Sequence, residues 1–178
     1  HEAFRNEGGM MEKDASYYIE HLGLEPHAEG GYFRSTFSSD NTISANGLDR
    51  KLYTSIYFLL GEKDISHLHR LKSDELWYFH GGDPLTVHVI DQEGSYHEYK
   101  LGLDLVNGEV PQLIVPGKSI FGSSVSEGGA FSLVGCMVAP GFEYEDFELF
   151  TQDELLKKYP EHASVICKLA YKNIPNTY

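Results

Sequence analysis

The chain has 178 residues, of which 41% are hydrophobic and 23% are charged, and its 27 acidic against 14 basic residues give a formal net charge of -13. This length predicts one domain, and the composition is that of a globular protein and not of a disordered one. The charge argues against nucleic-acid binding, because an acidic surface repels phosphate backbones. The longest apolar run, residues 56–60, is too short to span a bilayer, so we expect a soluble protein without a membrane partner.

Two cysteines and the start of the chain bear on its cellular context. Cys136 and Cys167 are too few for a secreted disulfide framework or a zinc ribbon. Both lie among apolar residues, so we expect buried, reduced thiols in a cytoplasmic protein.

Residues 1–11 lack a periodic pattern and the chain does not begin with Met, so we interpret them as an extension or a remnant of expression. Residues 12–178 are then expected to form a single domain.

The first predicted element is a short helix over residues 15–22, which Asp14 caps and Gly23 ends. Between residue 30 and about residue 150, short segments rich in Val, Ile, Tyr, Phe and Thr alternate with turn-forming residues. Regular short strands without helices between them are typical of an antiparallel sandwich or barrel. The predicted strands cover residues 32–38, 52–60, 65–71, 75–80, 85–91, 95–101, 112–115, 119–124, 131–138 and 145–150.

The end of the chain is predicted to be helical. Thr151 and Glu154 have the spacing of a capping box at the start of a helix over residues 152–159. A second helix, over about residues 162–171, has apolar residues along one stripe. The sequence therefore predicts a β-rich domain with one small helix before it and two after it.

Two histidines in the predicted strand 65–71 are the main candidates for a functional site. Residues two apart on a strand face the same way, so His67 and His69 are expected to project together from one side. Glu75 comes from the following strand and can meet them from across the sheet. Two imidazoles and one carboxylate suit a divalent transition metal such as Zn, Fe, Mn or Ni. Without a metal, the same groups would serve as a general acid–base set.

Other side chains are candidates for the wall of a pocket. Trp77 and Phe79 alternate with Glu75, so they line the same cavity if Glu75 points inward, with plain core packing as the alternative. Arg34, on the first strand, could hold a carboxylate or phosphate of a ligand, or form a surface ion pair. Tyr57 could supply a pocket hydroxyl. These residues define the expected substrate-binding wall.

Three further features are assigned to the surface. His80 and His88 are expected to face outward or toward a partner subunit. Arg70 follows His69 directly and should face the opposite side, in a structural or interfacial role. The acidic run at residues 143–146 is interpreted as a solvated edge, because a calcium loop needs more oxygen ligands at a defined spacing.

The histidine segment resembles the first motif of the cupin superfamily. That motif is a glycine, five residues, His-x-His, a short gap, Glu, six residues and a second glycine. The matching positions are Gly61, His67, His69, Glu75 and Gly82, and the gap before the glutamate is one or two residues longer than usual. The resemblance implies that the two histidines and the glutamate are ligands of a metal.

The second cupin motif is matched only in part. It has a proline–glycine turn, here Pro116 and Gly117, followed by a histidine that is the fourth ligand. Phe121 stands where that ligand is expected. The resemblance therefore implies at most a three-residue metal site, with Phe121 beside it in the pocket wall.

Several other segments are similar to a cupin branch that is labelled as a domain of unknown function, over about residues 13–169. They are residues 26–35, 56–60, 69–77, 82–85, 101–104 and 138–149. The resemblance implies a cupin double-stranded β-helix, the RmlC-like jelly roll of dTDP-sugar epimerases, auxin-binding proteins and germins, together with an inner cavity and a homodimer. It implies no activity, since a fold does not determine a function.

Three functional hypotheses remain open. The first is an isomerase or epimerase that acts on a sugar or sugar derivative by proton abstraction next to a carbonyl. In it, the two histidines are bases or ligands, Glu75 orients them or completes a metal site, and Arg34 binds an anionic group. The second is a non-catalytic small-molecule binder or sensor, with Trp77, Phe79 and Phe121 around a mostly apolar cavity. The third is a metal-dependent dioxygenase-type cupin.

Overall fold

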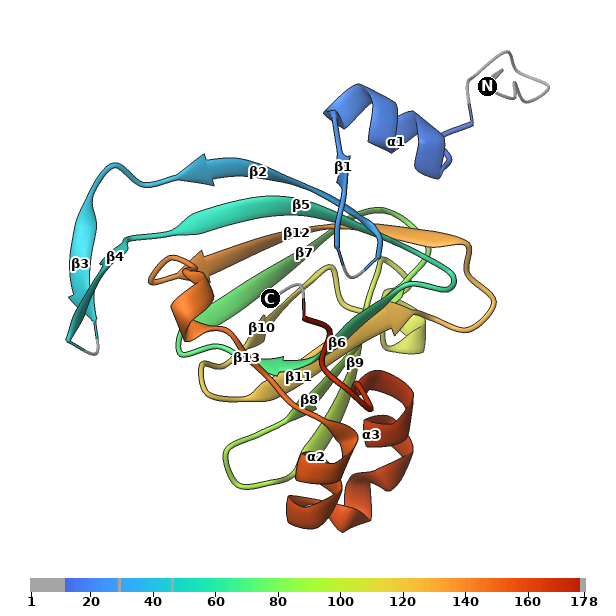
Figure 1. The fold of residues 1–178 in the computed structure, drawn as a ribbon. Helices are drawn as coiled ribbons and strands as arrows, with labels where there is room; N and C mark the ends of the chain where they lie inside the picture. Colours follow the sequence, from blue (N-terminus) through green and yellow to red (C-terminus); the bar gives the residue numbers. More distant parts are fainter. Residues whose placement is uncertain (1–11, 29, 46, 177–178) are drawn as a thin grey trace.

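Two antiparallel β-sheets that face each other form the body of the protein (Figure 1). This computed structural model describes residues 12–28, 30–45 and 47–176, so the predicted extension, residues 1–11, lies outside the described residues. Within the described chain the two sheets remain separate hydrogen-bonded units and not one closed barrel. The mainly β sandwich that the sequence predicts is therefore confirmed.

The larger sheet has six strands, and their order in space differs from their order in the chain. That order is β1 (Glu25–Pro26), β2 (Tyr32–Ser38), β5 (Thr54–Gly61), β12 (Phe131–Ala139), β7 (Asp74–Gly82) and β10 (Gln112–Val115). The late strand β12 pairs antiparallel with β5 on one side and with β7 on the other. This crossover places residues from four distant parts of the chain side by side on one inner face.

The smaller sheet lies opposite. Its order is β13 (Glu148–Leu149), β6 (Ile65–Arg70), β11 (Ile120–Val125), β8 (Leu85–Ile90) and β9 (Tyr96–Leu101). A separate hairpin, β3 (Thr42–Ala45) and β4 (Leu48–Lys51), extends away from the body at the left of Figure 1. The hairpin is absent from the predicted elements, because most of the residues in β3 and β4 are polar.

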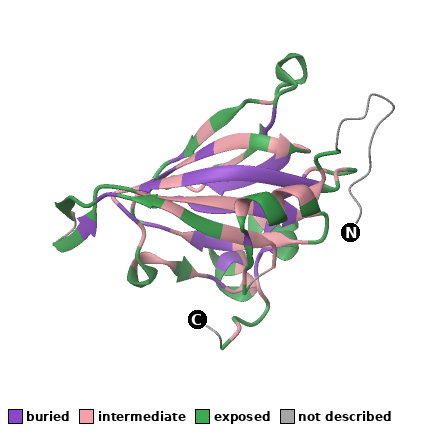
Figure 2. Ribbon diagram, turned by 90° about the horizontal axis from the view of Figure 1, so that it is seen from above, coloured by how far each residue is buried: buried purple, intermediate pink, exposed green. Residues whose placement is uncertain are grey.

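The main core fills the space between the sheets. Strands β8 and β11 are buried at every position, since the second sheet covers one face and the C-terminal helices cover much of the other. Burial of each large apolar side chain stabilises the fold by about 1.5–3 kcal/mol. Figure 2 shows the buried residues along the central strands. The fully buried part of this core includes Leu60, Trp77, Leu85, Val87, Val89, Leu101, Val115, Phe121 and Val134.

The three predicted helices are present. In α1 (Ala15–Leu22) the Asp14 carboxylate accepts a hydrogen bond from the Tyr17 N–H at 2.9 Å, and Gly23 ends the helix with a left-handed φ of 63°. Helix α1 packs on the outer face of the six-stranded sheet. In α2 (Gln152–Lys158) the Glu154 N–H donates to the Thr151 hydroxyl at 3.2 Å, as the capping box predicts.

The C-terminal helices α2 and α3 (Ala163–Leu169) pack against the outer face of the five-stranded sheet. Short 3-10 turns are η1 (Leu105–Asn107), η2 (Tyr144–Asp146) and η3 (Pro160–His162). Of the helices in the described residues, none has the length and apolar character needed to cross a membrane.

Two expectations are corrected by the structure. Residues 145–150 are not one strand, since η2 occupies their beginning and only Glu148–Leu149 pair with β6. Cys136 is a buried free thiol as expected, but Cys167 is exposed. The physical reason is that α3 buries the stripe of Val165, Ile166 and Leu169, and Cys167 lies off that stripe.

Candidate functional site

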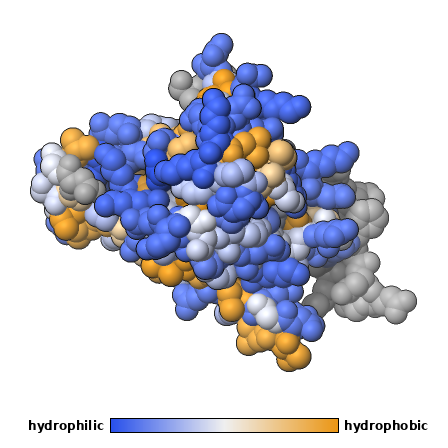
Figure 3. All heavy atoms as spheres, turned by 90° about the horizontal axis from the view of Figure 1, so that it is seen from below, coloured by the Kyte–Doolittle hydropathy of each residue, from blue (hydrophilic) through white to orange (hydrophobic). Residues whose placement is uncertain are grey.

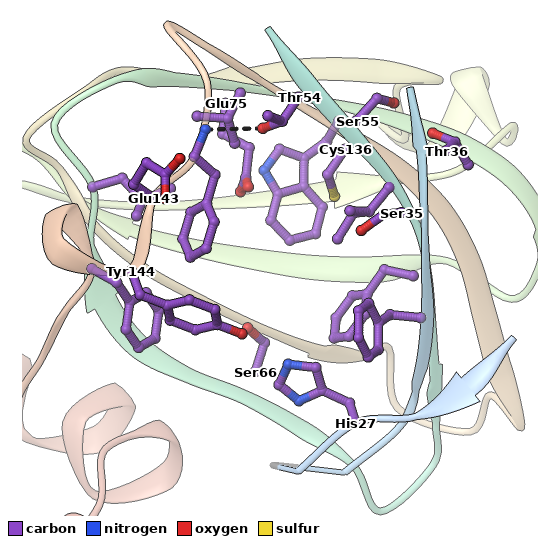
Figure 4. A pocket seen from close by; sticks show the side chains of 18 of the residues that line it. His27, Ser35, Thr36, Thr54, Ser55, Ser66, Glu75, Cys136, Glu143 and Tyr144 are labelled. Carbon is purple, nitrogen blue, oxygen red and sulfur yellow. Dashed lines mark hydrogen bonds between the residues drawn. The ribbon is translucent and has the colours of Figure 1, made fainter. Parts of the chain in front are cut away.

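A cavity of about 490 Å³ lies between the two sheets, at the end of the sandwich where β4 leads into β5 (Figure 4). This volume is within the usual range of small-molecule sites. Its wall is mostly apolar and aromatic, with a few hydroxyl and titratable groups. The apolar side chains include Phe33, Ile56, Phe58, Trp77, Phe142 and Phe147, and the hydroxyl groups include Ser35, Thr54, Ser55 and Ser66.

Glu75 is the central acidic group of the cavity. It begins the inner face of β7, it is 9% exposed, and Val138 stands opposite it on β12. Burial raises the pKa of its carboxyl from 4.5 to about 8, because the charged form loses its hydration. The nearby Trp77 indole acts in the opposite direction, but the effect of burial is larger. Glu75 is therefore a neutral acid at pH 7.

Cys136 lies beside Glu75, on the neighbouring strand, directly opposite Trp77. Figure 4 places Cys136, Ser55 and Glu75 on the same side of the cavity, across from Ser66. Burial raises the pKa of the Cys136 thiol well above its ordinary value, and the Glu75 charge adds to the effect. Both groups are thus uncharged near neutral pH, and the deep part of the cavity disfavours charge.

His69 reaches the cavity from the opposite sheet. Its ring lies between Phe121, at 4.1 Å between ring centres, and Phe147, at 5.0 Å. The Nδ1 atom of His69 is 2.7 Å from the carbonyl oxygen of His67. A carbonyl oxygen can only accept, so Nδ1 carries the hydrogen and the lone pair of the neutral ring is on Nε2. The site therefore holds His69 in one tautomer.

His67 does not join His69 in the cavity, which corrects the expectation that both histidines project from one side. The pairing of β6 with β11 is irregular, because Phe121 stands opposite His69 and Ser123 opposite Ser66. Two residues of β6 consequently face the single Gly122, and this bulge turns the His67 side chain to the outer face. There its ring stacks on Tyr171, with 3.6 Å between ring centres and 7° between planes.

The predicted metal ligands are consequently not assembled. Within residues 12–28, 30–45 and 47–176, no group of three or more His, Cys, Asp and Glu side chains is placed to hold a metal ion. His69 and Glu75 line the cavity, whereas His67 is not among its described lining residues. Phe121 fills the core against His69, where a fourth ligand would be needed. This arrangement does not fit the three-ligand cupin metal site.

The predicted substrate-binding residues fall into two groups. Trp77 lines the cavity, and Phe79 and Phe121 pack in the core around it without being among the described lining residues. Arg34 and Tyr57 are paired across β2 and β5 and lie on the outer face of the sheet. Tyr57 contacts the His80 ring and the cluster under α1. The Arg34 Nη1 donates to the Leu22 carbonyl at 2.8 Å, at the end of α1.

The mouth of the cavity is formed by a loop that the sequence does not identify. This loop, residues 142–147, places Phe142, Glu143, Tyr144 and Phe147 at the cavity. The Phe142 N–H donates to the Thr54 hydroxyl at 2.9 Å, drawn as a dashed line in Figure 4. We name residues 142–147 the mouth loop.

The hairpin β3–β4 anchors the mouth loop. The Arg50 guanidinium donates to Asp146 at 2.8 Å and to Glu145 at 2.7 Å, and the Asp146 side chain is only 9% exposed. The interpretation of this acidic run as a solvated edge is therefore wrong for Asp146. No local pattern identifies this contact, because Arg50 and Asp146 are 96 residues apart.

The comparisons with known proteins agree with this architecture. Protein SO0799 from Shewanella oneidensis is 48% identical, with a TM-score of 0.82 over 91% of this chain and 100% of that chain. A hypothetical protein from Leishmania major is 43% identical, with a TM-score of 0.85 over 89% of this chain and 99% of that chain. The uncharacterized protein YML079W of Saccharomyces cerevisiae is 30% identical over 83% of this chain and 81% of its own length.

A more distant likeness concerns the fold alone. Oxalate decarboxylase of Bacillus subtilis, whose Mn(II) centres have been studied, is 15% identical, with a TM-score of 0.51, and this chain covers 42% of it. The jelly roll expected from the sequence is thus confirmed.

Residues 16–150 match the family described as Cupin superfamily (DUF985). The chain therefore belongs to this family of the cupin superfamily.

Proposed function

We propose that the protein binds a small carbonyl-bearing molecule in the cavity, of the sugar or sugar-derivative class, and isomerises or epimerises it by proton transfer. The observation that carries this proposal is Glu75, a carboxyl with a pKa of about 8 inside a mostly aromatic cavity. A neutral carboxylic acid can donate a hydrogen bond to a carbonyl oxygen and stabilise the negative charge that develops when a neighbouring carbon loses its proton.

His69 supplies the complementary base. Its Nδ1–H is bound to the His67 carbonyl, so the basic nitrogen of the neutral ring is Nε2. Two rings hold the imidazole in place, and this fixes the direction from which a proton is removed. In this mechanism the carbon-bound proton moves to His69 Nε2, the Glu75 O–H supports the carbonyl oxygen, and return of the proton to another carbon or face gives the product.

The second candidate is a non-catalytic binder of a mostly apolar molecule. It is favoured by the neutrality of the deep cavity, where both Glu75 and Cys136 carry no charge near pH 7. A metal-dependent dioxygenase is not proposed, because the donor set His67, His69 and Glu75 is divided between the two faces of β6 and the facing sheet.

We also propose a homodimer in the cytoplasm. The hairpin end of the molecule exposes several apolar side chains, visible at the left of Figure 3, and such patches are typical of protein contacts. They are Phe37, Ile43, Leu48, Leu52 and Tyr53. The double variant Ile43→Glu with Leu48→Glu should convert a dimer to a monomer in sedimentation velocity. A wild-type monomer at all concentrations would exclude the dimer.

Proton transfer at carbon is tested by hydrogen–deuterium exchange. D-Fructose, D-xylulose and a nucleotide-linked 4-keto sugar are incubated with the protein in D2O, and loss of the proton next to the carbonyl is followed by NMR. The wild type should accelerate exchange for at least one of them. Glu75→Gln replaces the acidic O–H by a much weaker amide donor of the same shape, and His69→Gln removes the basic nitrogen, so each should slow the exchange by about 100-fold or more.

The matched control is His67→Phe, which keeps an aromatic ring against Tyr171 and should leave the exchange rate unchanged. If the sugars stabilise the wild type but no hydrogen–deuterium exchange is seen, the non-catalytic binder is favoured over the isomerase. Loss of exchange in His67→Phe but not in His69→Gln would contradict the assignment of the base.

A further inference from the structure

Four residues on four neighbouring strands form one row across the inner face of the six-stranded sheet. Ser38 on β2 stands opposite Thr54 on β5. Val138 on β12 stands opposite both Thr54 and Glu75, which is on β7. All four residues line the cavity. Neighbouring strands are about 4.8 Å apart, so the backbones of Thr54 and Glu75 are roughly 10 Å apart along this row. The row therefore connects the mouth of the cavity with its deep end.

The mouth end of the row carries a lysine. Lys51, at the end of β4, lines the cavity, and its ammonium donates to the Ser38 hydroxyl at 3.1 Å. The Lys51 backbone carbonyl accepts from the Gly141 N–H at 2.7 Å, directly before the mouth loop. The start of this side chain is thus fixed beside the mouth, while the residue as a whole stays exposed to water.

The Lys51 ammonium can bind a further acceptor. Among the described residues it is paired with a neutral hydroxyl and with no carboxylate. An ammonium has three N–H donors, so two remain after the bond to Ser38. Lys51 is also the one lysine or arginine in the described lining of the cavity. An anionic group of a ligand at the mouth would therefore meet this ammonium.

Hydroxyl groups beside Lys51 can add further hydrogen bonds. The Thr54 oxygen accepts from the Phe142 N–H, so the Thr54 hydroxyl hydrogen is left for another acceptor. Figure 4 shows Thr54, Ser55 and Thr36 together on one side of the cavity. Thr36 lies at the irregular pairing of β2 with β5, and such a bulge redirects a side chain. Phosphate and carboxylate oxygens accept from hydroxyl and ammonium groups of this kind.

The two ends of the row differ in the charge that they tolerate. At the deep end, burial keeps the Glu75 carboxyl uncharged at neutral pH, and a poorly hydrated environment disfavours any charge. At the mouth, Glu143 is exposed, so water and salt screen its repulsion of an anion. A ligand with one neutral end and one anionic end therefore fits the cavity in a single orientation.

We propose that the ligand of the cavity is an acidic sugar, with its carbonyl at Glu75 and a terminal phosphate or carboxylate at Lys51. This proposal rests on the function proposed above for the same cavity, and it names the part of the substrate that the mouth recognises. A five- or six-carbon chain with an acidic end group suits the roughly 10 Å between the two ends of the row. The role that the sequence assigns to Arg34 is thereby given to Lys51.

Three ketoses that differ only at carbon 6 test this proposal with the whole chain. They are D-fructose, D-fructose 6-phosphate and D-fructuronate, which carry a hydroxyl, a phosphate and a carboxylate there. Saturable shifts of the Ser38 and Thr54 backbone amide signals in NMR spectra give each dissociation constant, whether or not the sugar reacts. At least one acidic ketose should bind at least tenfold more tightly than D-fructose, and the tighter of the two identifies the acidic group.

Variants at the mouth should change this preference in opposite directions. Lys51→Gln should reduce the preference for the acidic ketose over D-fructose by at least tenfold. Glu143→Gln removes a like charge and should increase the preference by about threefold. The matched control is Lys100→Gln, which removes the same charge on β9, outside the described lining of the cavity, and should keep the wild-type preference.

The proposal is overturned if D-fructose binds as tightly as both acidic ketoses, if none of the three binds at millimolar concentration, or if Lys51→Gln weakens all three equally. Hydrogen–deuterium exchange is measured separately on the same three sugars. A preference without exchange would contradict the proton transfer and retain the anion site. Exchange without a preference would contradict the anion site and leave the proton transfer in place.

Discussion

The deep end and the mouth of the cavity lie on one row of residues across the six-stranded sheet, and they differ in their access to water. At the deep end, Glu75 and His69 are each 9% exposed, and the His69 ring lies between two aromatic rings. At the mouth, Lys51 and Glu143 are exposed, and hydroxyl groups lie beside them. One cavity thus offers two environments.

This difference predicts different parts of the ligand for the two proposed ends of the site. At the deep end, desolvation dominates, so even the carboxyl of Glu75 is uncharged at neutral pH. At the mouth, charges are retained, and selection depends on the charge of the end group of the ligand. The following predictions test whether the two ends respond separately, from the largest expected effect to the smallest.

Glu75→Gln should remove a strong dependence of stability on pH. Between pH 4.5 and about 8 the folded protein keeps the Glu75 proton that the unfolded chain releases, so the free energy of unfolding of the wild type falls as pH rises. The slope is about 1.4 kcal/mol per pH unit, and the total is a few kcal/mol. The variant should therefore gain stability relative to the wild type across this range, with a plateau above it.

Urea unfolding at a series of pH values measures this difference. Glu143→Gln is the control at the mouth, because Glu143 is exposed and should not reproduce the trend. A constant difference between Glu75→Gln and the wild type from pH 4.5 to 8 would contradict the raised pKa of Glu75.

Arg50→Ala should affect the mouth of the cavity and not its deep end. It removes the anchor of the mouth loop and leaves the Asp146 carboxylate without its main partner. We expect the Tm to fall by roughly 5–10 °C and ligand uptake in the cavity to weaken, while the pH dependence of stability that Glu75 causes stays the same. The control is Lys72→Ala, which removes a longer, more exposed contact to Asp146 at 3.6 Å and should have a much smaller effect. Equal losses in both variants would show that Arg50 has no special role.

Arg34→Ala should have the smallest effect. Among the described residues, its guanidinium donates to the Leu22 carbonyl at the end of α1, on an exposed outer face. We expect a loss of less than about 1 kcal/mol and no change in either the exchange assay or the preference for acidic ketoses. Unfolding in urea gives the first quantity. A large loss of exchange activity would instead support a role of Arg34 in substrate binding, as the sequence predicts.

Local patterns predict most of the strands and the helix caps. Asp14 and Thr151 accept from the first turns of their helices, as their spacing predicts, because capping depends on a few neighbouring residues. The inward direction of Glu75 and Trp77 also follows from alternation along β7. These features need no knowledge of the rest of the fold.

Features that depend on distant pairing are not predictable in this way. Arg34 and Phe33 are neighbours in a strand, and the sequence of β2 has polar and apolar residues at both parities, so it does not identify the inner face. Arg50 meets Asp146 only because the hairpin folds back onto the mouth loop. The bulge at His67 arises from the register of β6 with β11, which is separated from it by some fifty residues of chain.

The extra residue of β6 at this bulge determines whether the His67 side chain faces the cavity or the outer face of the sheet. Deletion of Ser66 would remove the extra residue of β6 and draw His67 into the position opposite Ser123, on the inner face with His69. Two imidazoles would then face the cavity that holds Glu75. The loss of a single codon is therefore expected to bring together on one face the side chains that the register of β6 and β11 now keeps apart.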